Sequence, residues 1–272
     1  MIAPGTEQNE AHSRSTDVTA LRALQRILAP LTVACLFASC AHEKENEAVA
    51  PQLAVHTVDM RLAIDFRHDG HAYDISSAYE DDFGHLFQLD TMRFLLSKAY
   101  AVNDDGDVLA DYSNVFMLVD AAGSTHFDLG PLTADHLHEI KFNIGLEPLV
   151  NHADPSVAEP PLNDLSMHSS SNAEGYCLLQ VTGRVDSNAD GVVDETDQRF
   201  SHRCTGDDLF SAYATEVHAN LPESGELTGW LPVDMRILLS DIDLLNTPSS
   251  TGSGSVNAAW MQRLKNSMEQ EH

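Results

Sequence analysis

A twelve-residue segment, 186–197, carries oxygen-bearing side chains at a spacing that suits a calcium ion. Positions 1, 3, 5, 9 and 12 of this segment are Asp186, Asn188, Asp190, Asp194 and Asp197. Calcium takes about six to eight oxygen ligands, and alternate side chains can supply them only if the chain curls around the ion. Gly191 at position 6 permits that curl, and Val192 at position 7 offers its backbone carbonyl. The segment therefore predicts a calcium site.

Asp197 stands where an EF-hand has a bidentate glutamate, so the loop resembles dockerin-type calcium loops more closely. The preceding residues, 175–185, alternate like a strand, which disfavours the helix–loop–helix arrangement of a calcium sensor. We expect the ion to stabilise a connection between strands. The alternative is a turn rich in Asp, Asn and Gly within an acidic chain, with no bound ion.

The composition bounds both the fold and the class of partner. With 272 residues, 43% of them hydrophobic, the chain can bury one substantial core as a single large β domain. The chain has 15 Lys and Arg and 42 Asp and Glu, which gives a net charge of −27. Such a surface repels nucleic-acid phosphates and attracts cations, so a nucleic-acid partner is disfavoured and metal ions are favoured. The 14 histidines add further metal ligands.

The N-terminal residues indicate export as a bacterial lipoprotein. Three arginines precede an apolar run at 27–38 that is too short to remain as a transmembrane helix, and small residues lead to Cys40. We expect residues 1–39 to be a signal peptide, Cys40 to be lipidated, and 40–52 to be a flexible tether. The expected location is the bacterial cell envelope, as an outer-membrane lipoprotein facing the periplasm or the cell surface. An ordinary cleaved signal peptide is the alternative, and it also exports the chain.

Two cysteines, Cys177 and Cys204, stand on either side of the predicted calcium loop. Exported thiols usually oxidise, so we expect a disulfide between them. The alternative is that the pair supplies two thiolate metal ligands.

Short alternating segments separated by turn residues predict an all-β fold. Leu62, Ile64 and Phe66 alternate with polar or small neighbours, as in a half-buried strand. Further strands are predicted at 86–96, 99–102, 115–119, 139–144, 176–185, 213–219 and 235–239. Their spacing of roughly ten to twenty residues favours an antiparallel β-sandwich, immunoglobulin-like or related, with long loops and an inserted calcium loop. The domain is expected to span 53–247, followed by a flexible tail at 248–272 with a short helix at 258–268.

Four groups of segments, in this order, resemble the MbnP family, whose members are exported copper-binding proteins related to the copper-scavenging surface proteins of methane-oxidising bacteria. The first two are LAIDFRHDG at 62–70 and FQLDTMRFLLS at 87–97. The third joins FMLVD at 116–120 to IKFNIG at 140–145, with Asn151 beyond. The fourth comprises Gly175–Tyr176, Gly183, Val217–His218 and the closing segment 237–245. The order and spacing carry the resemblance, which covers most of 53–246.

The chain departs from the family at one important point. Before the Gly-Tyr pair the family typically has Met followed by two Trp, one of which becomes kynurenine and joins the copper site in some members. Here residues 167–176 contain no Trp, and the two tryptophans are Trp230 and Trp260. A kynurenine site is therefore not expected. The resemblance implies a dihaem oxidase-type partner, which modifies this Trp in the family, but the Trp is absent here.

The resemblance implies copper ligands at His68 and His218, which we expect to meet at one rim of the sandwich. His71 and His168 offer additional nitrogens and Met167 a sulfur, and all these donor types suit copper. Each histidine near a strand end has a plainer interpretation as a solvated polar residue. His136 and His138 would share a face if extended, but they lie in a turn-like stretch and we assign them to the surface.

Catalysis is disfavoured because the chain has no nucleophile elbow, phosphate loop or His-Glu-x-x-His zinc motif. The sequence instead predicts an exported, lipid-anchored protein that captures or carries copper, with a structural calcium ion. Its partners would be metal ions, and the membrane through the lipid anchor alone. The alternative is a non-catalytic envelope module that binds calcium but has lost the family's copper site.

Overall fold

The computed structural model describes residues 55–169, 171 and 173–269. The expected signal peptide, the lipidation site Cys40 and the tether 40–52 lie outside the described residues. The strands and helices in chain order are β1 (His56–His68), β2 (His71–Ala72), β3 (Tyr79–Glu80), β4 (Leu86–Val102), β5 (Val108–Asp120), β6 (His126–Ala134), β7 (His136–Ile144), α1 (Pro148–Asn151), β8 (Cys177–Val185), β9 (Gln198–Thr205), β10 (Ser211–Asn220), β11 (Glu226–Asp234), α2 (Met235–Leu239), β12 (Ser249–Gly252) and α3 (Ser255–Ser267). Short 3-10 turns lie at Leu165–Met167 and Asp207–Leu209.

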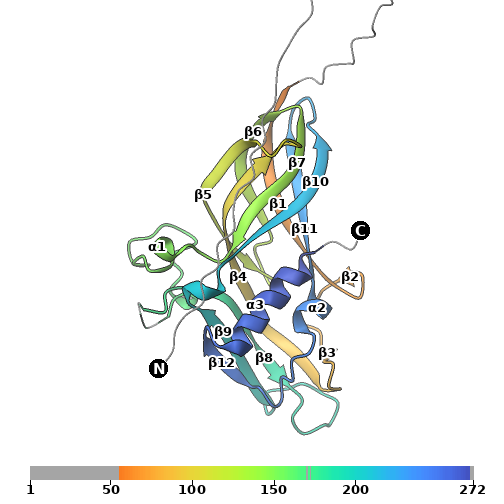
Figure 1. The fold of residues 1–272 in the computed structure, drawn as a ribbon. Helices are drawn as coiled ribbons and strands as arrows, with labels where there is room; N and C mark the ends of the chain where they lie inside the picture. The colour runs from red at the N-terminus through yellow and green to blue at the C-terminus, as the bar shows by residue number, and fades with distance from the viewer. Residues whose placement is uncertain (1–54, 170, 172, 270–272) are drawn as a thin grey trace, which may run out of the picture. The chain divides into compact units, whose positions relative to one another are not determined.

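The first sheet is built around β1, which pairs with β11 on one side and with β6 and β2 on the other (Figure 1). Alternate residues of β1, among them Met60, Leu62 and Ile64, are buried. Side chains of a strand point to opposite faces in turn, so this alternation directs one face of β1 into the core.

The second sheet has the order β10-β7-β4-β8-β9-β12, and β3 and β5 also pair with β4. β4 is 17 residues long and pairs with β8 along Phe87–Phe94 and with β7 along Leu96–Val102. This strand therefore passes through both halves of the sheet. A register shift at Lys98, whose φ is +53°, interrupts the pairing of β4 with both β5 and β7.

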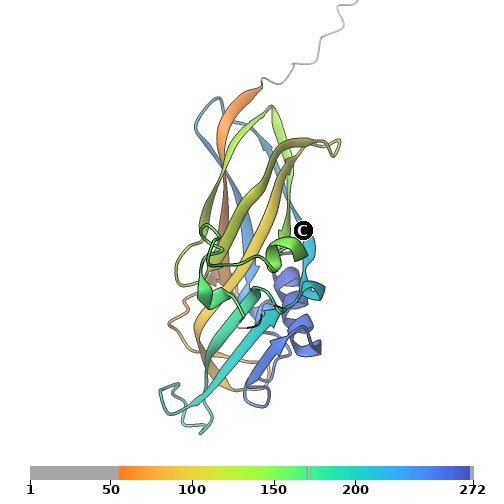
Figure 2. The ribbon, with the colours of Figure 1, turned by 90° about the vertical axis from the view of Figure 1, so that its left-hand side faces the viewer.

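The two sheets pack face to face around one hydrophobic core, as the two views of the fold show (Figures 1 and 2). Phe66 of β1 meets Phe94 of β4 edge to face, with ring centroids 6.3 Å apart. The sheets also approach closely at Gly229 of β11, where an added Cβ would lie 2.5 Å from Cδ1 of Ile140 of β7. The predicted all-β sandwich is confirmed. No helix in the described part of the chain is long and apolar enough to cross a membrane.

Strand direction differs from the prediction in two places. β1 pairs with β11 in parallel, and β9 pairs with β12 in parallel, so both sheets are mixed rather than purely antiparallel. Each pair joins strands that are distant in sequence, and the intervening chain supplies the long crossover that parallel pairing requires.

The C-terminal region also differs from the prediction. The predicted strand at 235–239 is the helix α2, because Asp234 caps it by accepting hydrogen bonds from the backbone amides of Arg236 and Ile237. The region predicted as a flexible tail instead forms β12 and α3, and α3 buries Trp260 fully. The short helix expected at 258–268 is therefore present, but it belongs to the core, and α2 and α3 pack against each other (Figure 1).

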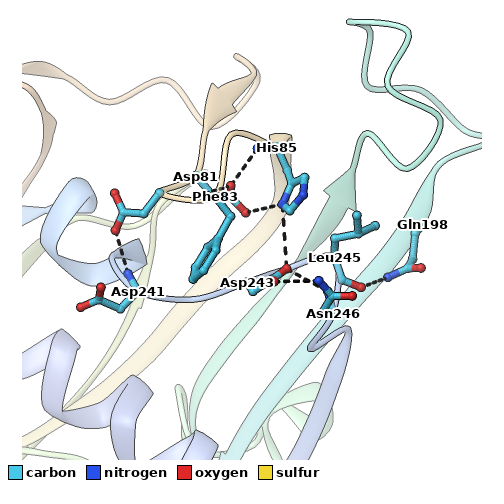
Figure 3. Close-up of polar contacts among 9 residues, drawn as sticks. Asp81, Phe83, His85, Gln198, Asp241, Asp243, Leu245 and Asn246 are labelled. Carbon is cyan, nitrogen blue, oxygen red and sulfur yellow. Dashed lines mark hydrogen bonds and ion pairs between the residues drawn. The ribbon is translucent and has the colours of Figure 1, made fainter.

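Polar contacts hold the segment after α2 against the second sheet (Figure 3). The side chain of Asp81, fully removed from solvent, lies 3.2 Å from Nδ1 of His85, and that nitrogen lies 3.9 Å from Oδ1 of Asp243. Further along, Gln198 of β9 donates to the carbonyl oxygen of Leu245 at 2.7 Å. The segment is thus fixed between the turn before β4 and the start of β9.

Candidate metal centre

Three histidines and one aspartate come together where β7 begins and β10 ends. His136 and His138 are two apart on β7, so their side chains share a face. His218 lies near the end of β10, the neighbour of β7. Asp104 belongs to the turn between β4 and β5. We call Asp104, His136, His138 and His218 the rim cluster.

A β-bulge directs His218 into the rim cluster. The register of β10 with β7 passes from Glu216 opposite Glu139 to Ala219 opposite Leu137, so two residues of β10 lie opposite His138. The φ of His218 is +44°, a left-handed conformation that non-glycine residues seldom adopt. Bulges change the direction of a side chain, and backbone strain of this kind is often found at functional sites.

The distances within the cluster suit shared ligation of one cation. Nδ1 of His138 lies 3.2 Å from Nδ1 of His218 and 3.1 Å from Oδ1 of Asp104. Two nitrogens about 2.0–2.1 Å from a tetrahedral ion would be separated by about 3.3 Å. One ligand atom from each of Asp104, His138 and His218 can be chosen so that all lie within 4.8 Å of one another. Nε2 of His136 lies 3.7 Å from Oδ2 of Asp104 and can join this set.

Outer contacts orient two of the rings. Nδ1 of His136 lies 3.0 Å from Oδ1 of Asn220, and Nε2 of His218 lies 3.4 Å from Oε2 of Glu216. Metal-binding histidines commonly hydrogen-bond through the nitrogen that does not face the ion, which fixes the orientation of the ring. Such contacts leave Nε2 of His136 and Nδ1 of His218 facing the cluster.

The cluster opens to solvent in an acidic setting. His136 and His218 line an open hollow of about 580 Å³ together with Asn103, Asp104, Asp105 and Asp135. The side chains of the cluster are 22% to 64% exposed, so an ion can enter without rearrangement of the fold. Surrounding carboxylates raise the local concentration of cations. The donors are imidazole nitrogens and a carboxylate, a set that suits copper(II) and zinc.

The copper ligands predicted from the sequence do not all meet. His68 ends β1, where its ring lies 4.5 Å from that of Tyr79, and His71 is exposed on β2. The start of β1, His56, pairs with Ala134 just before the rim cluster, and His68 lies at the other end of this 13-residue strand, roughly 40 Å away. His68 and His218 therefore do not share a rim.

His168 and Met167 lie in a third region, beside the start of β8. The ring of His168 meets that of Tyr176 edge to face at 4.8 Å, and its Nδ1 lies 2.6 Å from the carbonyl oxygen of Ser169. Met167 is 1% exposed and packs in the hydrophobic core, which keeps its sulfur from a metal at the surface. Of the five proposed copper ligands, only His218 joins the rim cluster.

His136, His138 and Asp104 were not predicted as ligands. The i, i+2 spacing of the two histidines was visible, but their stretch was interpreted as a turn, whereas the structure places both on β7. Asp104 lies in the turn between β4 and β5, and sequence spacing does not show that this turn lies beside β7.

The predicted calcium loop occupies the whole connection between β8 and β9. Asp186 and Asp197 at its two ends are 7% and 6% exposed. Asn188, Asp190, Val192 and Asp194 are exposed at its outer part. The six predicted calcium ligands are therefore found in one loop.

Cys177 and Cys204 are free thiols, and both are buried, so the expected disulfide is not formed. They lie on adjacent strands but are not opposite each other, since Cys177 pairs with Thr205 and Cys204 with Leu179. Burial raises the pKa of the Cys177 thiol to about 11 and that of Cys204 even further above its usual value. Both therefore stay protonated at neutral pH, which also disfavours a thiolate metal site.

Comparison with known proteins connects this architecture to one family. The MbnP family model matches residues 57–257, which contain both the rim cluster and the 186–197 loop. Among solved structures, MbnP from Methylosinus trichosporium is similar at 12% identity, covering 75% of this chain and 82% of that chain with a TM-score of 0.45. No curated protein matches the chain. Because the family model covers well over half of the 272 residues, the chain belongs to the MbnP family.

Proposed function

We propose that this protein binds copper at the rim cluster in the bacterial cell envelope. Membership of the MbnP family indicates a copper-related function and an envelope location. The observation that supports this particular site is the 3.2 Å approach of Nδ1 of His138 to Nδ1 of His218, with Oδ1 of Asp104 3.1 Å from His138.

The chemistry of the donors supports copper over other common ions. Neutral imidazoles donate nitrogen lone pairs, and one carboxylate offsets part of the charge of a dication. Among divalent first-row metals, copper binds such a nitrogen and oxygen set most tightly. The exposure of the rim cluster supports capture and transfer of the ion rather than permanent storage in the core. In this proposal His138 and His218 are the principal ligands, and Asp104 and His136 complete the set.

The proposed location includes a lipid anchor at Cys40. The arginines and short apolar run before Cys40 support it, and Ala41 after the cysteine differs from the aspartate that retains lipoproteins in the inner membrane. We assign no catalytic step to the protein. The absence of Trp from 167–176 gives a Trp-modifying dihaem oxidase no substrate at this point of the sequence.

Copper titration of paired variants tests the assignment. The purified protein is titrated with copper(II) against a competing chelator, and bound copper is counted by elemental analysis. We expect about one tightly bound copper per chain, and His138→Ala with His218→Ala should weaken its binding by at least about 100-fold.

A matched control is the double variant His68→Ala with His71→Ala, which also removes two histidines. We expect wild-type copper binding from it, because these residues lie at the far end of β1. If the His138 and His218 variant keeps copper binding and the control loses it, the copper site lies at the end of β1 and the assignment to the rim cluster is wrong. Absence of copper binding by the wild-type protein would leave a non-catalytic envelope module.

A further inference from the structure

We propose that the loop 186–197 binds one Ca²⁺ ion that fixes the end of the β8–β9 hairpin. The last pair of the hairpin is Val185 opposite Gln198, so Asp186 and Asp197 leave the two strands side by side. The backbone amide of Asp186 also donates to the carbonyl oxygen of Leu86 at 2.8 Å. Strand pairing therefore positions the first and last proposed ligands before any ion binds.

The buried carboxylate of Asp186 is directed into the loop. Its Oδ2 accepts a hydrogen bond from the backbone amide of Gly191 at 2.9 Å, across the turn. Asp197, at the other end, accepts from the backbone amides of Ser187 at 3.0 Å and Asp194 at 2.9 Å. Both carboxylates are thus held on the inner side of the loop, and only 7% and 6% of the two residues are exposed.

Oδ1 of Asp186 is the observation that points to a cation. This oxygen is shielded from solvent and accepts no hydrogen bond, and it is the only carboxylate oxygen in that condition among the described residues. A buried anionic oxygen without a donor is costly, and a bound cation removes that cost. Arg184, two residues earlier, makes no hydrogen bond to this oxygen, and its Nη1 lies 3.8 Å from Oδ1 of Asp90.

The remaining donors specify calcium rather than a transition metal. The loop contains carboxylate, amide, hydroxyl and backbone carbonyl oxygens and has no His, Cys or Met. Asn188 and Asp190 lie at the exposed outer part of the loop, where Oδ1 of Asn188 accepts from the backbone amide of Asp190 at 2.8 Å and Oδ1 of Asp190 accepts from that of Val192 at 3.0 Å. An oxygen with two lone pairs can bind a cation through the second, and Oδ2 of Asp190 is a further donor. A hard, oxygen-only set of this size suits Ca²⁺, which accepts about six to eight ligands.

This site is independent of the proposed copper site. Asp186 bonds to Leu86 at the start of β4, whereas the rim cluster includes Asp104 just beyond the end of that strand. Calcium binding at this loop can therefore be tested separately from copper binding at the rim cluster.

Calcium titration of the whole protein tests the proposal. Protein treated with a chelator and desalted is titrated with CaCl₂ in a calorimeter, and its Tm is measured with and without calcium. We expect a single high-affinity site, and at about 100 times Kd the ion should raise Tm by roughly 5–10 °C. Mg²⁺ at the same concentration should bind more weakly, because it demands near-octahedral geometry.

Two ligand variants and one control locate the ion. Asp186→Asn should weaken calcium binding at least tenfold, and Asp190→Asn, on an exposed side chain that does not support the fold, should do so too. Glu195→Gln removes one charge from the same loop at position 10, which supplies no ligand, and should retain wild-type affinity. A Tm unaffected by calcium, or equal calcium affinity in all four proteins, would overturn the proposal.

Discussion

His202 is a histidine that the fold holds in its neutral form. It lies on β9 with no exposed surface, its Nδ1 is 2.7 Å from Oγ of Ser250, and its ring lies 5.1 Å from that of Trp260. Burial lowers the pKa of His202 to about 4, against an ordinary value of about 6.5 in the unfolded chain. As pH falls, the unfolded chain therefore takes up this proton first.

We predict a loss of stability in acid that depends on His202. The contribution of neutral His202 to the free energy of unfolding is complete above about pH 6.5 and is lost as pH falls from 6.5 toward 4. At pH 5 the loss is roughly 2 kcal/mol. Urea unfolding of wild type and His202→Gln at several pH values gives two curves of stability against pH, and their difference isolates this group. Parallel curves would show that His202 does not titrate differently in the folded and unfolded states.

The rim cluster shows what residue patterns reveal and what they miss. His218 could be selected from the sequence because it fitted a family pattern, but its partners could not. A bulge that changes the direction of one side chain leaves no trace in hydrophobic periodicity, and Asp104 is more than 100 residues from His218 in sequence. The calcium site proposed at 186–197 could be suggested from spacing because all six proposed ligands lie on one continuous segment.

Among the elements, α3 depends on a single large anchor. Trp260 is fully buried, with Met261 and Leu264 beside it on the same helix. We predict that Trp260→Ala lowers the free energy of unfolding by about 3–5 kcal/mol, because it removes a large buried ring and leaves a cavity. Thermal or urea unfolding measures this loss. Exposed Val256 on the same helix offers a control, and Val256→Ala should change stability by less than about 0.5 kcal/mol.

The structure of the misassigned elements depends on contacts that the local hydrophobic pattern does not show. Strands such as β1 and β4 could be predicted because their buried and exposed residues alternate. Residues 235–239 form a short segment that is apolar except for Arg236. Periodicity could therefore not separate strand from helix, and the Asp234 cap decided the outcome. Ser249–Gly252 has the composition of a linker, but it forms β12 because β9 offers it an unpaired edge and Asn257 bonds to Gly252.

For the whole molecule, β4 separates the two proposed metal sites. The strand has 17 residues, which span roughly 50 Å between the end near the calcium loop and the end near the rim cluster. The Debye length at physiological salt is about 8 Å, so direct electrostatic coupling between two ions at this separation is negligible. Any coupling would have to pass through a change in the fold.

We therefore predict that the two ions bind independently. Calcium affinity measured by calorimetry should be the same, within about twofold, for copper-free and copper-loaded protein, and by thermodynamic reciprocity calcium should leave copper affinity unchanged. The His138 and His218 double variant should keep wild-type calcium affinity, and Asp186→Asn should keep wild-type copper affinity, because sites this far apart without shared contacts behave additively. A tenfold change in either cross-measurement would instead show that β4 or the packed sheets have two states that both ions select, which would make calcium a regulator of copper binding.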